Sequence, residues 1–180
     1  MTADAQLTGP RVVIRPFRLD DVPAVLRYAS DPEVSRYLPW EPYSDPETAE
    51  AFVASTLRGA DRWYARAIEL RATGDVVGGV DLRIDPRDRR TAEIGYALAR
   101  TFWGRGYAHE AADLMLTFAF TELQIETIHA LCVRENTRSI HILERLGLIP
   151  DPTPTFPSWG IRTEPNHQKW TLTKTMWGPG

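Results

Sequence analysis

Two glycines in the stretch "RTFWGRGYAHEA", residues 100–111, constrain the fold of this chain more than any other feature of its sequence. The alternating segment Thr91–Ala99 before them predicts a strand, and apolar residues at helical spacing after them predict a helix over 107–123. The pattern is therefore a strand, a glycine loop and a helix. Such a loop presents unpaired backbone amides at the positive end of a helix, which suits an anion such as a pyrophosphate.

Taken alone, Gly104 and Gly106 are better explained by a tight turn in which only glycine fits. A dinucleotide-binding loop would have a third glycine where His109 stands, and a P-loop would continue with Gly-Lys-Ser/Thr. The sequence has neither pattern. A nucleotide-binding domain is therefore disfavoured, and the remaining segments have to decide what the loop binds.

Outside the loop, the segments predict a single α/β domain. Alternating or β-branched runs predict strands at 11–18, 63–71, 76–85, 125–133 and 167–177, with a hairpin turn at 73–75. Sequential hairpins with two crossover helices favour a mixed, mostly antiparallel sheet of six to seven strands, flanked by about four helices.

Three further helices are predicted from their end signals. The first is capped by Asp20, and the second runs from Asp45 to about Arg58. The third covers 136–147, with Asn136 as its N-cap and Gly147 at the left-handed position that ends it. These helices, together with the one after the glycine loop, account for the four that we expect.

Composition excludes several classes of function. The 180 residues are 43% hydrophobic, which suits one domain with a full core. A net charge of -3 argues against a general nucleic-acid binder. Cys132 is the only cysteine and lies in an apolar run, so we expect a buried thiol and a cytoplasmic protein. The sequence has no secretion signal and no membrane-spanning run. Its four histidines show no spacing that suggests a metal site, so we expect no metal.

Three sequence motifs, "AEIGYAL", "FWGRGYAHEA" and "VRENTRSIHILERLGL", follow one another in the order and at the spacing usual in a known family. Together they resemble the GNAT acyltransferases and, within them, the ribosomal-protein alanine acetyltransferases. The resemblance covers about 7–177, so we expect one GNAT domain over 1–180. It implies direct transfer of an acetyl group from acetyl-CoA to a primary amine in a ternary complex. The acceptor would be a small molecule or a protein N-terminus, and the enzyme a monomer or homodimer.

The resemblance also implies which residues hold coenzyme A. Loop residues would bind the pyrophosphate, mainly through backbone amides: Trp103, Gly104, Arg105, Gly106, Tyr107, Ala108 and His109. The backbone of Tyr96, Ala97 and Leu98 would pair with the pantetheine arm where the family's strand splays from its neighbour, and an N–H near Leu98 would polarise the thioester. Asn136 would contact the coenzyme arm, although its role as a helix cap explains it equally. Arg105 adds charge to the phosphates or contributes only solubility.

Two residues are catalytic candidates by the same resemblance. Many relatives protonate the departing thiolate with a tyrosine seven residues after the asparagine, but Leu143 stands there in this chain. Ser139, also a contact of the coenzyme, is the replacement, unless it merely caps its helix. Glu93 is the candidate base, because some relatives use a glutamate on this strand. A buried structural glutamate, or one that faces solvent, is the alternative reading.

The acceptor pocket is expected at an aromatic loop. Tyr37, Trp40 and Tyr43 lie between two predicted helices, and Trp159 in a proline-rich segment should face them. Isolated aromatic residues are usually part of a core, but three in one loop favour a binding function. One alternative from another class is a non-catalytic acyl-CoA-binding module, for which the missing tyrosine is the only support.

Overall fold

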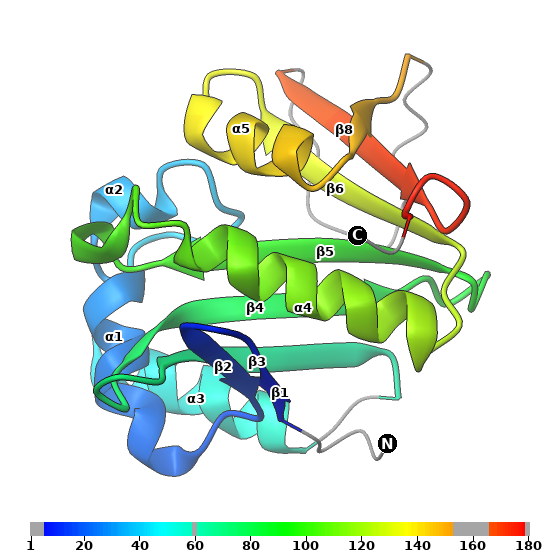
Figure 1. Cartoon of the computed structure of the whole chain (residues 1–180). Helices are drawn as coiled ribbons and strands as arrows, with labels where there is room; N and C mark the ends of the chain where they lie inside the picture. The colour runs from blue at the N-terminus through cyan, green and yellow to red at the C-terminus, as the bar shows by residue number, and fades with distance from the viewer. Residues whose placement is uncertain (1–5, 59–60, 153–165, 179–180) are drawn as a thin grey trace.

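The computed structural model describes residues 6–58, 61–152 and 166–178, which form one sheet with helices on both faces (Figure 1). The strands are β1 (Leu7–Thr8), β2 (Val12–Arg15), β3 (Trp63–Leu70), β4 (Val76–Ile84), β5 (Thr91–Leu98), β6 (Thr127–Val133), β7 (Ile149–Pro150) and β8 (His167–Thr173). The α-helices are α1 (Val22–Ala29), α2 (Pro32–Ser35), α3 (Pro46–Leu57), α4 (Tyr107–Thr121) and α5 (Thr137–Arg145). Two 3-10 helices, η1 (Leu19–Asp21) and η2 (Arg100–Phe102), precede α1 and follow β5.

The strands are ordered β1-β2-β3-β4-β5-β6-β8-β7, and only β5 and β6 run parallel. The mixed, mostly antiparallel sheet predicted from the sequence is confirmed. The predicted numbers of elements are too low, because the described residues contain eight strands and five α-helices. β1 and β7 have two residues each and α2 has four, too few for alternation or a helical period to show in the sequence.

The prediction that Asp20 caps the first helix is wrong. Asp20 lies in η1, and the residue before α1 is Asp21. Asp21 makes no side-chain capping bond to α1, because its carboxylate accepts from the guanidinium of Arg15 and the backbone N–H of Arg18. An ion pair with Arg15, six residues earlier at the end of β2, has replaced the cap of α1.

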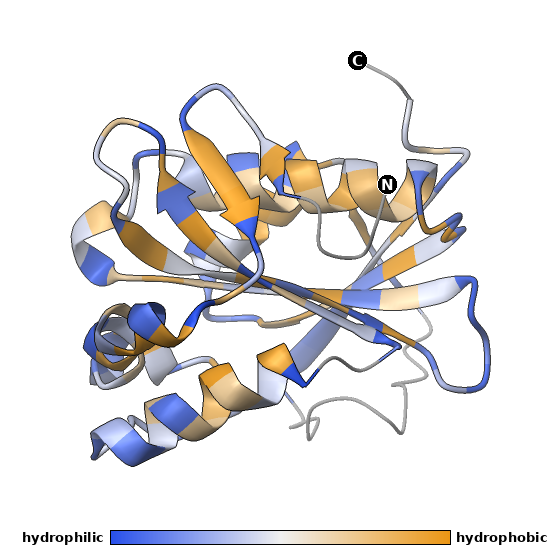
Figure 2. Ribbon diagram, turned by 90° about the horizontal axis from the view of Figure 1, so that it is seen from below, coloured by the Kyte–Doolittle hydropathy of each residue, from blue (hydrophilic) through white to orange (hydrophobic). Residues whose placement is uncertain are grey.

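Each face of the sheet has its own hydrophobic core. α4 covers one face, where its Met115 packs in a cluster with Ile94 and Leu98 of β5. α1 and α3 cover the other face, where Val53 of α3 shares a second cluster with Ala97 of β5 (Figure 2). Because successive side chains of a strand point to opposite faces, β5 contributes to both cores in turn.

β5 and β6 are paired along only part of their length. The described ladder begins with Thr91 opposite Thr127 and ends with Glu93 opposite His129. Beyond this point β5 continues against β4 as far as Leu98, while β6 continues against β8. The two strands therefore diverge toward the end of the sheet that carries α5 and the start of α4 (Figure 1).

The backbone of the diverging part of β5 turns alternate groups toward the β6 side, where the Leu98 carbonyl accepts from the Trp103 indole. The N–H of Ala99 bonds to the carbonyl of Val77, in line with the β4 ladder. In an antiparallel pair the bonding direction alternates, so Ala97 faces β4 while Tyr96 and Leu98 turn their backbone N–H and C=O groups toward the β6 side. The predicted divergence of this strand from its neighbour is present, but the backbone of Ala97 is already paired with Gly79 of β4.

Candidate active site at the splay of β5 and β6

The glycine loop begins α4 with two left-handed residues. Gly104 has φ +73° and Gly106 has φ +80°, a region that side-chain-bearing residues rarely adopt. Gly106 occupies the N-cap position of α4 without a side-chain cap. The first N–H groups of a helix have no partner within it, so the amides from Tyr107 to His109 are directed out of the helix end. This arrangement, with the positive end of the helix dipole behind it, suits an anion.

Arg11, just before β2, holds the loop in place. Its Nη1 donates to the carbonyl of Arg105 at 2.7 Å, and its Nε donates to Glu110 Oε2 at 2.8 Å. Glu110 Oε1 accepts from the backbone N–H groups of Arg11 and Val12 at 2.7 and 2.9 Å. Burial opposes ionisation of Glu110, but these bonds outweigh it and lower its pKa. The loop is therefore fixed to the sheet by charge-assisted hydrogen bonds.

Trp103 connects the loop to the end of β5 and to α5. Its indole N–H donates to the carbonyl of Leu98 at 2.7 Å. The guanidinium of Arg138, on α5, lies 4.7 Å from the centre of the Trp103 ring. This cation–π contact spans from one diverging arm of the sheet to the other. Arg105, the loop's own cation, stacks instead over Phe102 at 5.7 Å.

Tyr96, Ser139, Asn136 and Cys132 form a polar group where α5 begins. The hydroxyl of Tyr96 lies 2.9 Å from Ser139 Oγ, and Asn136 Oδ1 accepts from the N–H of Ser139 at 3.2 Å. The predicted N-cap role of Asn136 is thus confirmed. Cys132 is buried as expected, and burial raises the pKa of its thiol. Leu143, at the family's tyrosine position, is also buried, with 1% of its surface exposed.

Glu93 lies on the opposite face of the sheet from Tyr96, as the alternation along β5 requires. In the strand ladders it lies opposite Arg83 of β4 and His129 of β6. Only 4% of its surface is exposed, and no described residue gives its Oε2 a hydrogen bond. Burial raises the pKa of Glu93 to about 7, although nearby Arg83 opposes the shift. Burial also lowers the pKa of His129 to about 4, so this imidazole is neutral at pH 7.

A second carboxylate lies on the same face as Glu93. Asp81 is paired with Gly95, whose missing Cβ leaves room for Asp81 Oδ1: a Cβ there would lie 2.8 Å from that oxygen. Asp81 Oδ2 accepts from the Trp63 indole at 2.8 Å and from Arg83 Nε at 2.9 Å. Two carboxylates and an aromatic ring therefore lie together on the α1 and α3 side of β5.

The aromatic loop lies on this side too. Trp40 and Tyr43 are partly buried against the second core, whereas Tyr37 stacks with Arg36 at 5.3 Å. Trp40 Nε1 is buried and has no partner among the described residues. The structure thus places two of the three aromatic residues at the core and leaves Tyr37 apart. Trp159 lies outside the described residues.

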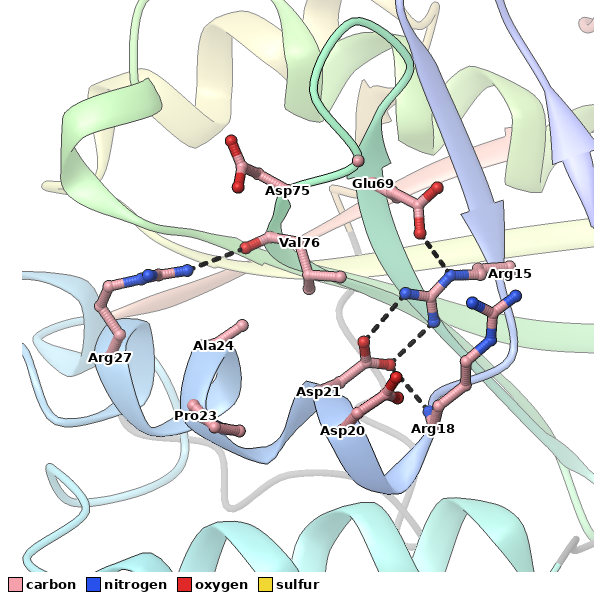
Figure 3. A pocket seen from close by; sticks show the side chains of 11 residues that line it. Arg15, Arg18, Asp20, Asp21, Pro23, Ala24, Arg27, Glu69, Asp75 and Val76 are labelled. Carbon is pink, nitrogen blue, oxygen red and sulfur yellow. Dashed lines mark hydrogen bonds and ion pairs between the residues drawn. The ribbon is translucent and has the colours of Figure 1, made fainter.

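A separate pocket of about 330 Å³ lies beside the N-terminal part of α1 (Figure 3). Arg15 donates there to both oxygens of Asp21, at 2.8 and 2.9 Å, and to Glu69 Oε2 at 2.6 Å. Hydrogen bonding to Asp21 raises the pKa of Arg15. The guanidinium is satisfied by these carboxylates, so its role is to hold β2, η1 and β3 together. No residue predicted from the sequence as a site residue lines this pocket.

The structure brings the predicted loop, the end of β5 and the start of α5 to one end of the sheet. Arg11, Asp81 and Arg138 were missed, because each gains its importance from contacts with distant segments: Arg11 meets Glu110 across 99 positions. In the described part of the chain, no group of histidine, cysteine and carboxylate side chains is arranged to hold a metal. Nor does any helix described here have the length and apolar character to cross a membrane.

Comparison with known proteins places this arrangement in a family. The description "Acetyltransferase (GNAT) domain" matches residues 11–149. An uncharacterized N-acetyltransferase, p20, from Bacillus licheniformis is 33% identical over 141 residues, covering 76% of this chain and 78% of p20. The spermidine N(1)-acetyltransferase of Escherichia coli K12 is 30% identical over 139 residues, covering 76% of this chain and 72% of that enzyme.

Solved structures agree in fold. A GNAT-family acetyltransferase from Bacillus anthracis has a TM-score of 0.82 at 24% identity, covering 95% of this chain and 99% of that one. A Vibrio cholerae spermidine N-acetyltransferase, in complex with CoA and spermine, has a TM-score of 0.78 at 17% identity, covering 94% and 99%. At these identities the likeness concerns the fold alone. Because the family match spans most of the chain, this protein belongs to the GNAT acetyltransferase family.

Proposed function

We propose that this protein transfers an acetyl group from acetyl-CoA to a primary amine, directly within a ternary complex. The observation that carries the proposal is the divergence of β5 from β6 after Glu93, which leaves the backbone groups of Tyr96 and the N–H of Leu98 facing the gap beside the amide-rich loop. We assign 7–177 as the catalytic domain. The pantetheine arm pairs with the free edge of β5, and its pyrophosphate binds the amides of 104–109.

The faces on which the side chains lie support a division of catalytic roles. Glu93 is on the α1 and α3 side of β5, where it removes a proton from the amine as the bond to the acetyl carbon forms. The N–H of Leu98 stabilises the oxyanion. Ser139 lies on the α4 and α5 side, where it donates a hydrogen bond to the sulfur as the C–S bond breaks and the electron pair goes to sulfur. Asn136 holds Ser139 through its backbone N–H at 3.2 Å.

Two features bear on the acceptor. Trp40, Tyr43 and Trp63 pack on the same side of the sheet as Asp81 and Glu93, and their aromatic rings favour a cationic amine. The charge of Asp81 is partly compensated by its ion pair with Arg83, so the rings rather than a net negative charge carry this preference. The similarity to a spermidine N(1)-acetyltransferase supports a polyamine. The tryptophan-glycine-basic-glycine-tyrosine-alanine loop supports a protein N-terminus, as in the ribosomal-protein alanine acetyltransferases. An α-amino group has a pKa near 8 and needs less help from a base than a polyamine does.

The test is acetyl-CoA-dependent release of free thiol with a panel of amines: spermidine, spermine, peptides with N-terminal alanine or serine, and a lysine peptide blocked at its N-terminus. Thiol release above the amine-free rate with at least one acceptor, together with its acetylated product by mass spectrometry, is the expected result. Tight binding of CoA without any acetylated product would support the non-catalytic acyl-CoA-binding module instead.

A further inference from the structure

We infer that Tyr96 is a positioning residue for the transfer reaction, because its hydroxyl orients the hydroxyl of Ser139 toward the coenzyme A sulfur. The inference rests on the proposed function and adds to it a side chain that the sequence motif does not assign. In the motif Tyr96 serves through its backbone alone. The structure gives its side chain a separate partner.

The geometry places the phenol across the divergence of the sheet. Tyr96 belongs to the part of β5 that has no β6 partner, and its side chain lies on the face that α4 and α5 cover. Its hydroxyl is 2.9 Å from Ser139 Oγ and 3.4 Å from the Ser139 carbonyl. Since Asn136 already holds the N–H of Ser139, both the backbone and the hydroxyl oxygen of this serine are fixed.

Either hydroxyl could donate in the 2.9 Å contact between Tyr96 and Ser139 Oγ, and the inferred role requires the phenol as the donor. Burial raises the pKa of Tyr96 above its ordinary value, so the phenol stays neutral and keeps its proton. When that proton is donated to Ser139 Oγ, the serine proton is left to point at another acceptor. Cys132 Sγ lies 3.4 Å from the Val133 carbonyl and 3.8 Å from the Asn136 carbonyl, and these carbonyls can accept the thiol proton. The same sulfur hydrogen-bonds to the Ser139 side chain, so it is the acceptor that the coenzyme A sulfur has to replace.

In the reaction, the serine proton is then available to the sulfur. The nitrogen–carbon bond forms, the carbon–sulfur bond breaks, and the sulfur leaves with the electron pair as a thiolate that accepts a hydrogen bond from Ser139. The proton of the amine goes to Glu93, so neither Tyr96 nor Ser139 has to lose its proton. A thiol has a pKa of about 8.5, so a hydrogen bond suffices to assist its departure.

The experiment is a double-mutant cycle with Tyr96→Phe and Ser139→Ala, using an acceptor found in the amine panel. Tyr96→Phe should lower kcat about three- to tenfold, the effect of one hydrogen bond, with little change in KM for acetyl-CoA. In the Ser139→Ala background the same change should have no further effect. Tyr64→Phe is the control, because Tyr64 packs on Phe118 beside the same core. Full turnover of Tyr96→Phe, or multiplicative losses in the double variant, would overturn the inference.

A binding measurement tests the same contact without turnover. At a pH above the pKa of the coenzyme A thiol, where the sulfur is a thiolate, the wild-type protein should bind CoA more tightly than desulfo-CoA by calorimetry. Tyr96→Phe and Ser139→Ala should each reduce that difference, whereas Tyr64→Phe should keep it. Equal affinities of the wild-type protein for the two ligands would contradict the sulfur contact, whatever the amine panel shows. Failure of acetyl transfer with the difference intact would instead reject the proposed function alone.

Discussion

Glu93 has 4% of its surface exposed, and in the described part of the chain its Oε2 has no hydrogen-bond donor. Burial of a carboxyl group without a hydrogen-bond donor disfavours its charged form, so burial raises the pKa of Glu93 to about 7. A purely structural glutamate would be expected to have its oxygens paired. A buried carboxyl group with one oxygen unpaired and a pKa near 7 has the properties expected of the proposed general base, at a cost in stability.

The Glu93→Gln variant separates the stability cost of Glu93 from its proposed role as a base. The folded pKa lies above the ordinary 4.5, so the folded state holds its proton more tightly and wild-type stability falls as pH rises from about 4.5 through about 7. Glutamine avoids this loss. The variant should therefore melt higher than wild type at pH 8 by a few degrees, and show no such advantage at pH 4.

The same variant should lose activity. With rates corrected for the fraction of neutral amine, wild-type kcat/KM should rise with pH and level off above about 7, as Glu93 ionises. Glu93→Gln should be slower by about 10²–10⁴-fold and lack that rise. Scanning calorimetry measures the melting temperatures at the two pH values, and pH–rate profiles measure kcat/KM. A variant with wild-type kcat/KM across the pH range would remove Glu93 from the mechanism.

At the scale of elements, the start of α4 depends on contacts made by its two glycines. A Cβ on Gly106 would lie 3.0 Å from Arg11 Nη2, whereas one on Gly104 would meet no atom within 4 Å. Both positions have positive φ, so alanine at either costs about 1–2 kcal/mol of backbone strain. Only at Gly106 does the new atom also press on the guanidinium that holds the loop.

Gly106→Ala and Gly104→Ala are therefore a matched pair. Both should lower the melting temperature by similar amounts. Gly106→Ala should weaken CoA binding by about tenfold or more, and Gly104→Ala clearly less, because Arg11 stays bonded to the carbonyl of Arg105. Isothermal titration calorimetry with CoA measures both affinities. Equal losses for the two variants would show that the contact with Arg11 has no part in forming the anion site.

Local signals predicted the elements better than their contacts. The N-cap at Asn136 and the left-handed Gly147, with φ +83°, follow from residue preferences that operate within one helical turn. The cap predicted at Asp20 failed because a 3-10 helix, Leu19–Asp21, precedes α1 and contains that residue. The contact between Tyr96 and Ser139 depends on how far β5 diverges from β6, and hydrophobic patterns do not encode that geometry.

For the whole molecule, the sheet consists of two arms that share one short parallel ladder. β1 to β5 form one arm, and β6, β8 and β7 form the other. Only the pairs from Thr91 opposite Thr127 to Glu93 opposite His129 join them in the described ladder. Beyond it, contacts between side chains connect the arms, including Tyr96 with Ser139 and Arg138 over Trp103. A ligand bound between the arms would therefore take the place of the missing strand pairing.

Amide hydrogen exchange, resolved by residue, tests this role of the ligand. The N–H groups of Tyr96 and Leu98 face the β6 side, whereas those of Gly95 and Ala97 face β4 by the alternation that the bond from Ala99 to Val77 sets. Saturating CoA should slow exchange at Tyr96 because the pantetheine arm accepts its N–H, and at Leu98 because the thiol end of the arm shields its N–H from solvent. Gly95 and Ala97 are already bonded in the sheet and should gain only the global stabilisation that ligand binding gives.

The control residues lie on the same strand, so they share its local environment and its global stability. A CoA complex in which Tyr96 and Leu98 slow by a factor well above that of Gly95 and Ala97 would support pairing of the arm with the free edge of β5. If all four amides slow by the same factor, CoA stabilises the fold from elsewhere and the edge of β5 is not its binding surface. The comparison requires no acceptor amine, so it tests the binding surface independently of the acetyl-transfer chemistry.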